Sequence, residues 1–149
     1  ETQLAVKEAF KNNSITSDTI LVVRFQGPKA NGMPELHGLT PVLAVLQDRG
    51  LRVALVTDGR MSGASGKVPS AIHLSPEAAV GGPISKLRDG DMIRLDARSG
   101  ALMVLEPDFE NRPVQTADLT GNHNGTGREL FDMFRNNVGL ATAGAGIVV

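Results

Sequence analysis

The sequence contains no cysteine, no tryptophan and no tyrosine, and its aromatic residues are five phenylalanines. Without cysteine, the chain can form no disulfide, no thiolate metal site and no cysteine nucleophile. The scarcity of aromatic rings predicts an aliphatic core and argues against a surface that stacks nucleic-acid bases.

Neither sign of charge predominates: the chain has 15 lysines and arginines and 16 aspartates and glutamates, for a net charge of −1. The chain therefore has no basic footprint for nucleic acid or for an anionic membrane surface. No apolar run approaches the roughly 20 residues that span a bilayer, and no basic-then-apolar signal segment is present. We expect neither nucleic acid nor a membrane as a partner, and a cytoplasmic location.

What the sequence does contain is enough for one globular unit. Its 149 residues, 41% of them apolar, predict a single domain over residues 1–149 with one core. The opening stretch "ETQLAVKEAFKNN" is typical of a helix inside a longer protein. We therefore expect this domain to be the C-terminal part of a larger polypeptide.

Predicted strands and helices alternate in the first half of the chain. "TILVVRF" (19–25) and "RVALVTD" (52–58) are nearly continuous in apolar character, which is typical of buried strands. "LTPVLAVLQDRG" (39–50) predicts a helix with Thr40 as its N-cap. "DMIRLDARSGALMVLEP" (91–107) predicts a hairpin around a glycine turn. This mixture indicates an α/β fold with a mixed sheet.

Three further segments carry local signals. "QGPKANGMPE" (26–35) is rich in glycine and proline and predicts a loop. "SPEAAV" (75–80) predicts the start of a helix capped by its serine. "GTGRELFDMFRNNVG" (125–139) predicts a helix that begins with a capping box of Thr126 and Glu129.

Two polar, glycine-rich loops follow the two predicted buried strands. The carboxyl ends of neighbouring strands meet at one edge of an open α/β sheet, where such sheets bind ligands. The loops offer carboxylates, cations and hydroxyls: Lys29, Asn31, Glu35, His37, Asp58, Arg60, Ser62, Ser65 and Lys67. This set suits a small anionic, polyhydroxylated ligand and a hard divalent cation. On composition alone, ordinary solvated surface loops are an equal alternative.

The loop after the second predicted strand matches neither of two familiar motifs. "GASGK" contains a Gly-Lys pair, but Val68 follows where a phosphate-binding loop needs Ser or Thr. "GRMSG" places Ser62 one position too late for a G-x-S-x-G nucleophile. Asp58 and His73 could complete a triad with Ser62 on paper, but a solvated loop serine and a hydrogen-bonded strand histidine are the simpler interpretation.

Four longer stretches carry a resemblance to a known family: "FQGPKANGMPELH", "VALVTDGRMSGASGKVPSAIHLSPEA", "LRDGDMIRLD" and "GTGRELF". Together they resemble the C-terminal domain of the dihydroxy-acid and sugar-acid dehydratases, over residues 25–131. "ANGMPELH" and "SGKVPSAIH" favour the 6-phosphogluconate branch. The resemblance implies a swivelling β/β/α domain, with a mixed, barrel-like sheet core and flanking helices, that works with its own N-terminal domain.

For function, the resemblance implies a hydro-lyase that converts 6-phosphogluconate to 2-keto-3-deoxy-6-phosphogluconate in the Entner–Doudoroff route. It implies a 4Fe–4S cluster with ligands in the N-terminal domain, to which the absence of cysteine here conforms, and a Mg²⁺ or similar divalent cation. It further implies a homodimer in the full-length enzyme and no activity for the chain alone.

The resemblance also assigns roles to residues. Ser62, in the "GR-SG" motif, would be the base in its alkoxide form, and Glu35, in "GMPE", the Mg²⁺ ligand from this domain. Weaker candidates for substrate or phosphate contacts are Arg60, Ser65, Lys67 and Ser70.

Two alternatives stay open. The chain could belong to a dehydratase for another sugar acid or a dihydroxy acid. It could also be a non-catalytic swivelling phosphocarrier or binding domain with His73 as the carrier residue, although the apolar neighbours of His73 argue against this.

Overall fold

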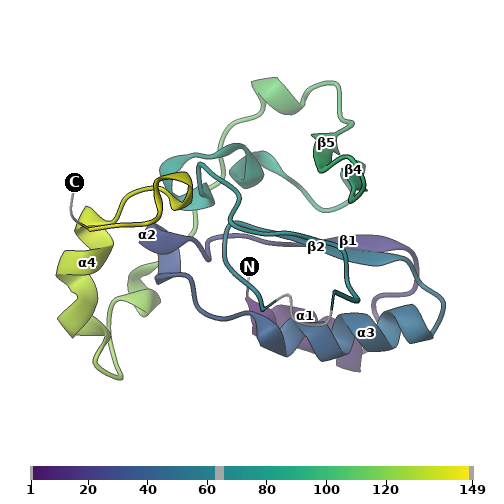
Figure 1. Cartoon of the computed structure of the whole chain (residues 1–149), viewed down its shortest axis with the longest axis horizontal. Coiled ribbons are helices and arrows are strands. Elements are labelled where there is room, and N and C mark those ends of the chain that lie inside the picture. The colour runs from purple at the N-terminus through teal and green to yellow at the C-terminus, as the bar shows by residue number, and fades with distance from the viewer. Residues whose placement is uncertain (1, 63–65, 148–149) are drawn as a thin grey trace.

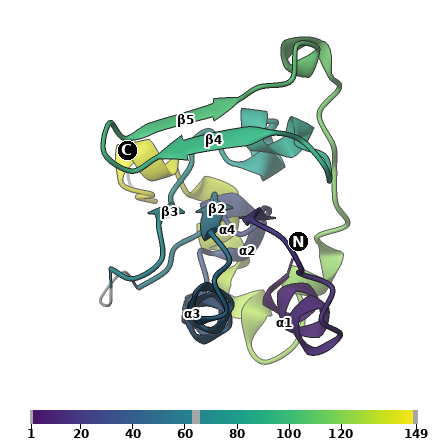
Figure 2. The same ribbon diagram turned by 90° about the vertical axis from the view of Figure 1, so that its right-hand side faces the viewer.

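The computed structural model describes residues 2–62 and 66–147. Its α-helices are α1 (Gln3–Lys11), α2 (Pro28–Asn31), α3 (Thr40–Asp48) and α4 (Asp132–Asn137), and its strands are β1 (Thr19–Val23), β2 (Val53–Thr57), β3 (Ser70–Ala71), β4 (Ile93–Asp96) and β5 (Ala101–Val104). Figures 1 and 2 show three layers: the β4–β5 hairpin, a sheet of β1, β2 and β3, and the helices α1 and α3.

The two sheets differ in strand direction. In the order β1-β2-β3 all neighbours are parallel, with Thr19 opposite Val53 and Leu55 opposite Ser70, whereas β4 and β5 are antiparallel. The predicted α/β domain is therefore confirmed, but in place of one mixed sheet the described residues form a parallel sheet and a separate antiparallel one. Within residues 2–62 and 66–147 the sheets do not close into a barrel, so the barrel-like core is not confirmed.

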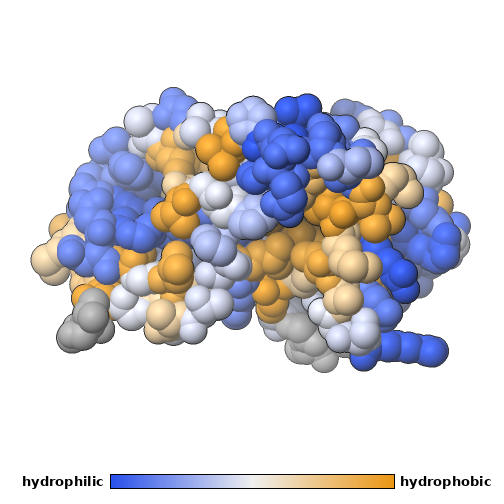
Figure 3. All heavy atoms as spheres, turned by 90° about the horizontal axis from the view of Figure 1, so that it is seen from above, coloured by the Kyte–Doolittle hydropathy of each residue, from blue (hydrophilic) through white to orange (hydrophobic). Residues whose placement is uncertain are grey.

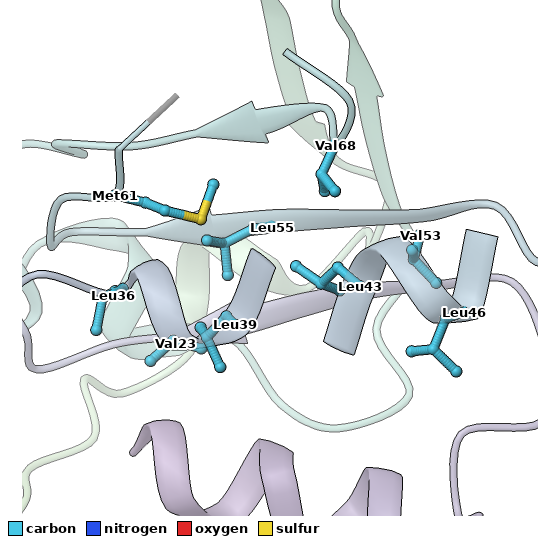
Figure 4. Close-up of a cluster of buried hydrophobic side chains, with 9 residues drawn as sticks. All are labelled: Val23, Leu36, Leu39, Leu43, Leu46, Val53, Leu55, Met61 and Val68. Carbon is cyan, nitrogen blue, oxygen red and sulfur yellow. The ribbon is translucent and has the colours of Figure 1, made fainter. Parts of the chain in front are cut away.

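Strand β2 lies at the centre of the core, and all five of its residues are buried. Because successive side chains of a strand point to opposite faces, Leu55 packs with the helical layer and Val56 packs under the hairpin layer. Figure 4 shows the first of these clusters, in which residues of α3 and the preceding turn meet β1 and β2: Val23, Leu36, Leu39, Leu43, Leu46, Val53, Leu55, Met61 and Val68. Of the segment 19–25 that was predicted to be buried, Val23 and Phe25 are buried and the other residues are half-buried, because β1 lies at the edge of the sheet.

The hairpin side of the molecule has a mixed surface. Seen from that side, apolar side chains reach the surface between hydrophilic ones (Figure 3). No helix of the described residues is long and apolar enough to cross a membrane.

Two local predictions are wrong for reasons of tertiary contact. The segment 26–35 contains the one-turn helix α2, which starts at Pro28 and ends where Gly32 adopts φ +66°. Residues 75–80 form no α-helix but a 3₁₀ turn (Ala78–Val80). The chain folds back there so tightly that a Cβ on Gly82 would lie 1.7 Å from the carbonyl oxygen of Pro76.

The predicted capping box near the C-terminus is also wrong. Thr126 has φ +54°, and Glu129 accepts a hydrogen bond of 2.7 Å from the backbone N–H of Gly125 instead. The segment therefore begins as a 3₁₀ turn (Arg128–Phe131) before it continues as α4.

Candidate active site

The two polar loops meet, as predicted, beyond the carboxyl ends of β1 and β2. Glu35 and Arg60 form an isolated parallel β-bridge, and the backbone N–H of Leu36 donates to the carbonyl of Arg60 at 3.0 Å. This short pairing extends the β1–β2 sheet edge into the loops. It brings the segment around Glu35 beside the segment around Ser62.

Glu35, Arg60 and Ser62 form one polar group, which we call the Glu35–Ser62 cluster. The backbone N–H of Ser62 donates to Oε1 of Glu35 at 2.6 Å, and Nη1 of Arg60 lies 3.4 Å from Oε2. The Nε of Arg60 donates to the carbonyl of Met33 at 2.7 Å, which fixes the guanidinium. The side chain of Glu35 is 31% exposed and that of Arg60 52% exposed, so a ligand can reach both.

Asp58 supports the cluster from below. Its carboxylate is fully buried and accepts three backbone hydrogen bonds, from Phe25 at 3.1 Å, Gln26 at 2.9 Å and Ala78 at 2.9 Å. One carboxylate thus holds together the ends of both strands and the 3₁₀ turn that follows Glu77. Hydrogen bonds to a charged acceptor are stronger than neutral ones, so Asp58 fixes the base on which both loops stand.

Glu77 is a second buried carboxylate in this base. Its Oε1 accepts from the backbone N–H of Lys29 at 2.8 Å, which places a negative charge at the start of α2. Burial raises the pKa of Glu77, and the nearby Asp58 adds to the effect, while the amide of Lys29 opposes it. A Cβ on Gly27 would lie 1.6 Å from Oε2 of Glu77. Glycine is therefore required where the loop passes over this carboxylate.

The remaining predicted site residues lie at different distances from the cluster. Ser70 and Ser62 line one hollow of about 180 Å³, and the hydroxyl of Ser70 donates to the carbonyl of Val68 at 3.1 Å. Nζ of Lys67 lies 2.7 Å from Oδ1 of Asp48 at the end of α3. Ser65 lies outside the described residues.

The geometry does not support a catalytic triad of Ser62, Asp58 and His73. Asp58 is committed to three backbone amides, and His73 is exposed, has φ +57° and follows β3 rather than lying in a strand. The predicted strand histidine is therefore wrong, and its ring belongs to the exposed surface.

Sequence reasoning missed the supporting network. The anchoring role of Asp58 has one signal, since an aspartate directly after a buried strand is suited to accept loop amides. Asn31 links this network to the C-terminal part of the chain. Its Nδ2 donates to Oε1 of Gln26 and its Oδ1 accepts from Nη1 of Arg128, both at 3.0 Å. No spacing in the sequence links Asn31 to a residue 97 positions away.

The cluster can provide part of a divalent-cation site. No group of three or more histidine, aspartate or glutamate side chains capable of holding a metal is found among the described residues. Mg²⁺, however, is commonly held by one or two protein carboxylates, with water and substrate oxygens as the other ligands. The accessible carboxylate of Glu35 fits that role. Without cysteine, the chain has no thiolate for an iron–sulfur cluster.

Comparisons with known proteins agree with these motifs. The chain is 59% identical to the phosphogluconate dehydratase of Zymomonas mobilis over 140 residues, which cover 94% of this chain and 23% of that protein. It is 59% identical to the phosphogluconate dehydratase of Pseudomonas aeruginosa, covering 96% and 24%. It is 46% identical to a dihydroxy-acid dehydratase of Sulfurisphaera tokodaii over 108 residues, covering 70% and 19%.

The chain spans about a quarter of the length of the curated phosphogluconate dehydratases that it matches. A family model described as "Dihydroxy-acid/6-phosphogluconate dehydratase C-terminal" matches residues 1–145. With loops that converge on Glu35 and Ser62, and a match over nearly its whole length, the chain belongs to the C-terminal domain family of the dihydroxy-acid and 6-phosphogluconate dehydratases.

Proposed function

We propose that this chain is the C-terminal domain of a hydro-lyase that dehydrates 6-phospho-D-gluconate to 2-dehydro-3-deoxy-6-phosphogluconate. The observation that carries the proposal is the contact between the backbone N–H of Ser62 and the carboxylate of Glu35 at the sheet edge. The identity of 59% to two phosphogluconate dehydratases, against 46% over a shorter match to a dihydroxy-acid dehydratase, supports this substrate branch.

The reaction needs a base and a leaving hydroxyl. The proton on C2, which is next to the carboxylate of the substrate, goes to the base, and the electrons of the C2–H bond form the C2–C3 double bond. The C3–O bond breaks, and the hydroxide takes up a proton and leaves as water. The enol that remains rearranges to the 2-keto product, so no oxidant or reductant is needed.

Ser62 is the proposed base, acting as an alkoxide. A serine hydroxyl reaches that form only when its surroundings favour the negative charge. The carboxylate of Glu35 positions Ser62 through its backbone but disfavours a second negative charge nearby, and the guanidinium of Arg60 offsets part of this. A divalent cation on Glu35 supplies further positive charge, which favours the alkoxide and stabilises the enediolate-like charge on the substrate.

The other residues of the site are proposed as substrate contacts because of where they lie. Arg60 belongs to the cluster, and Ser70 shares the hollow with Ser62, so both suit substrate contacts. Ser65 and Lys67, in the same loop, stay candidates for the phosphate or hydroxyl groups.

The rest of the active site belongs to another part of the enzyme in this proposal. An N-terminal domain supplies the thiolates for a 4Fe–4S cluster and further ligands for the cation, because this chain has no cysteine. The present domain is the swivelling unit, the full-length enzyme is a cytoplasmic homodimer, and the chain alone is inactive.

The substrate is tested with the full-length enzyme. We expect the highest kcat/KM with 6-phosphogluconate, and lower values with gluconate and with a dihydroxy acid, because a site built for a phosphorylated sugar acid gains binding energy from the phosphate. Preference for a substrate without phosphate would assign the enzyme to another branch of the family.

The base is tested by Ser62→Ala in the same enzyme. Loss of a general base costs about 10²–10⁴-fold in rate, so kcat falls by that factor while cluster content, measured by iron analysis and absorbance, stays unchanged. Ser99→Ala, at an exposed position in the hairpin turn, is the matched control and retains normal turnover. Near-normal activity of Ser62→Ala would remove Ser62 as the base.

A further inference from the structure

The C-terminal helical segment presents large apolar side chains to solvent. Four of them form what we call the α4 face, and their exposed fractions are 79% for Leu130, 56% for Phe131, 65% for Met133 and 40% for Phe134. A helix of a globular protein normally buries its apolar stripe against the core, yet neither α4 nor the 3₁₀ turn before it has a buried residue. The α4 face is therefore a surface that another body is suited to cover.

A groove runs along this face. It has a volume of about 600 Å³ and lies between α4 and α2, which are side by side in Figure 1. Its walls include Pro28, Met33 and Pro34 on one side and Phe131, Phe134 and Val138 on the other. A contiguous apolar groove, in contrast to scattered apolar residues, is typical of a binding surface.

The total exposed surface of the chain is larger than that of an average monomer of its mass. The chain exposes 8791 Å², whereas a monomeric protein of its mass exposes about 7300 Å². The excess of about 1500 Å² belongs to the whole chain, and it is larger than the roughly 800 Å² that each partner contributes to a standard protein interface.

The position of the groove favours one partner. Met33 and Pro34 line the groove and directly precede Glu35, and the carbonyl of Met33 holds the guanidinium of Arg60. A body that fills the groove therefore also lies against the Glu35–Ser62 cluster. That cluster offers one accessible carboxylate for a cation, so a partner at this place can supply the other ligands.

The chain connection points to the same partner. A second hollow, of about 360 Å³, shares Asn31, Pro34 and Arg128 with the groove and is also lined by Thr2 and Gln3. Since the family is a C-terminal one and its phosphogluconate dehydratases are about four times as long as this match, the polypeptide that precedes the matched region in them joins it beside this hollow.

We infer that the α4 face and its groove are the docking surface for the preceding domain of the same polypeptide, an inference that rests on the proposed function. Apolar side chains of that domain fill the groove between α4 and α2, and its polar groups complete the site at Glu35. A second copy of this chain is the weaker occupant, because it brings no cysteine for the proposed cluster.

Methionine oxidation in the unmodified full-length enzyme tests whether the face is covered. Met133 and Met92 are matched, with exposed fractions of 65% and 63% in this chain, and Met92 directly precedes the hairpin, away from the groove. Peroxide converts exposed methionine to the sulfoxide. We expect Met133 to oxidise about tenfold more slowly than Met92, measured by peptide mass spectrometry. Equal rates would overturn the inference.

Photo-crosslinking identifies the occupant. With p-benzoylphenylalanine in place of Leu130 in the full-length enzyme, we expect cross-links to peptides of the preceding domain in the same polypeptide, and none to that domain from the same probe at Met92. A mixture of ¹⁴N- and ¹⁵N-labelled subunits separates the outcomes, because cross-links of mixed label show a second copy and overturn the inference. Both readouts are independent of turnover, so an enzyme inactive on 6-phosphogluconate would refute the proposed function and leave this test valid.

Discussion

At the scale of single residues, the loops of the candidate site depend on buried carboxylates beneath them. Ser62 is exposed and Glu35 half-exposed, and their positions are set by the β-bridge of Glu35 with Arg60 and by the hydrogen bond from the N–H of Ser62 to the Glu35 carboxylate. Beneath them, Asp58 and Glu77 accept the amide N–H groups that the loops cannot satisfy by themselves. Buried backbone amides must find acceptors, and here two carboxylates provide them.

Replacing Asp58 by Asn tests this role. The amide side chain has one oxygen acceptor and no charge, so at least one of the three buried N–H groups loses its partner. We expect the free energy of unfolding to fall by about 3 kcal/mol, measured by urea denaturation of the purified chain.

Asp48→Asn is the control for Asp58→Asn. Its carboxylate is 67% exposed and pairs with Lys67 at the surface, where an ion pair contributes less than about 1 kcal/mol. Equal, small effects of the two substitutions would mean that Asp58 does not anchor the loops.

At the scale of elements, the β4–β5 hairpin is fixed at its base by Arg112. Its guanidinium is 7% exposed and donates to Asp91 at 2.6 Å and to Asp108 at 2.9 Å, which ties the chain two residues before β4 to the chain after β5. The hydrogen bond from Arg112 lowers the pKa of Asp91 and that of Asp108. The two ends of the hairpin are thus held together by a charged clamp.

The clamp predicts a pH dependence. A carboxyl whose pKa is lower in the folded than in the unfolded state stabilises the fold above its unfolded pKa, and this contribution is lost as the pH falls through the folded pKa. The urea midpoint of the wild-type chain should therefore drop below about pH 4. Asp91→Asn should be less stable at pH 7 and should approach the wild type as the pH falls. Asp89→Asn, exposed in the same turn, should follow the wild-type curve.

Local sequence signals predicted elements where local forces dominate. The hairpin and the helix α3 formed as expected, because alternating apolar residues around a glycine turn and a proline-led apolar helix need little help from elsewhere. The predicted N-cap is wrong, since Thr40 is the first residue of α3 and Leu39 precedes it without a side-chain cap. The one-turn helix α2 and the broken start of the α4 segment were not predicted. Glu77 holds the first from 48 residues away and Gly125 bonds Glu129 in the second, and neither contact follows from propensity.

At the scale of the whole molecule, the layers explain why function gathers at one edge. Parallel pairing of β1 with β2 puts Val23 opposite Thr57, so the loops after both strands start side by side. The helices α1 and α3 cover one face of the sheet and the hairpin the other (Figure 2), whereas the loops after β1 and β2 carry Glu35 and Ser62 at the carboxyl edge. The same arrangement leaves the α4 face beside that edge.

The sequence by itself determined the family, the buried central strand and the two loop motifs that carry Glu35 and Ser62. These features depend on residues that are adjacent in the sequence, because apolar runs, glycines and short motifs determine local structure. Only the tertiary structure decided that Glu35 reaches the backbone of Ser62, that Asp58 is an anchor and not a triad member, and that the apolar residues of α4 face outward. These three features depend on contacts between segments that lie far apart in the chain. Strand register and buried hydrogen bonds determine those contacts, and no local sequence pattern predicts them.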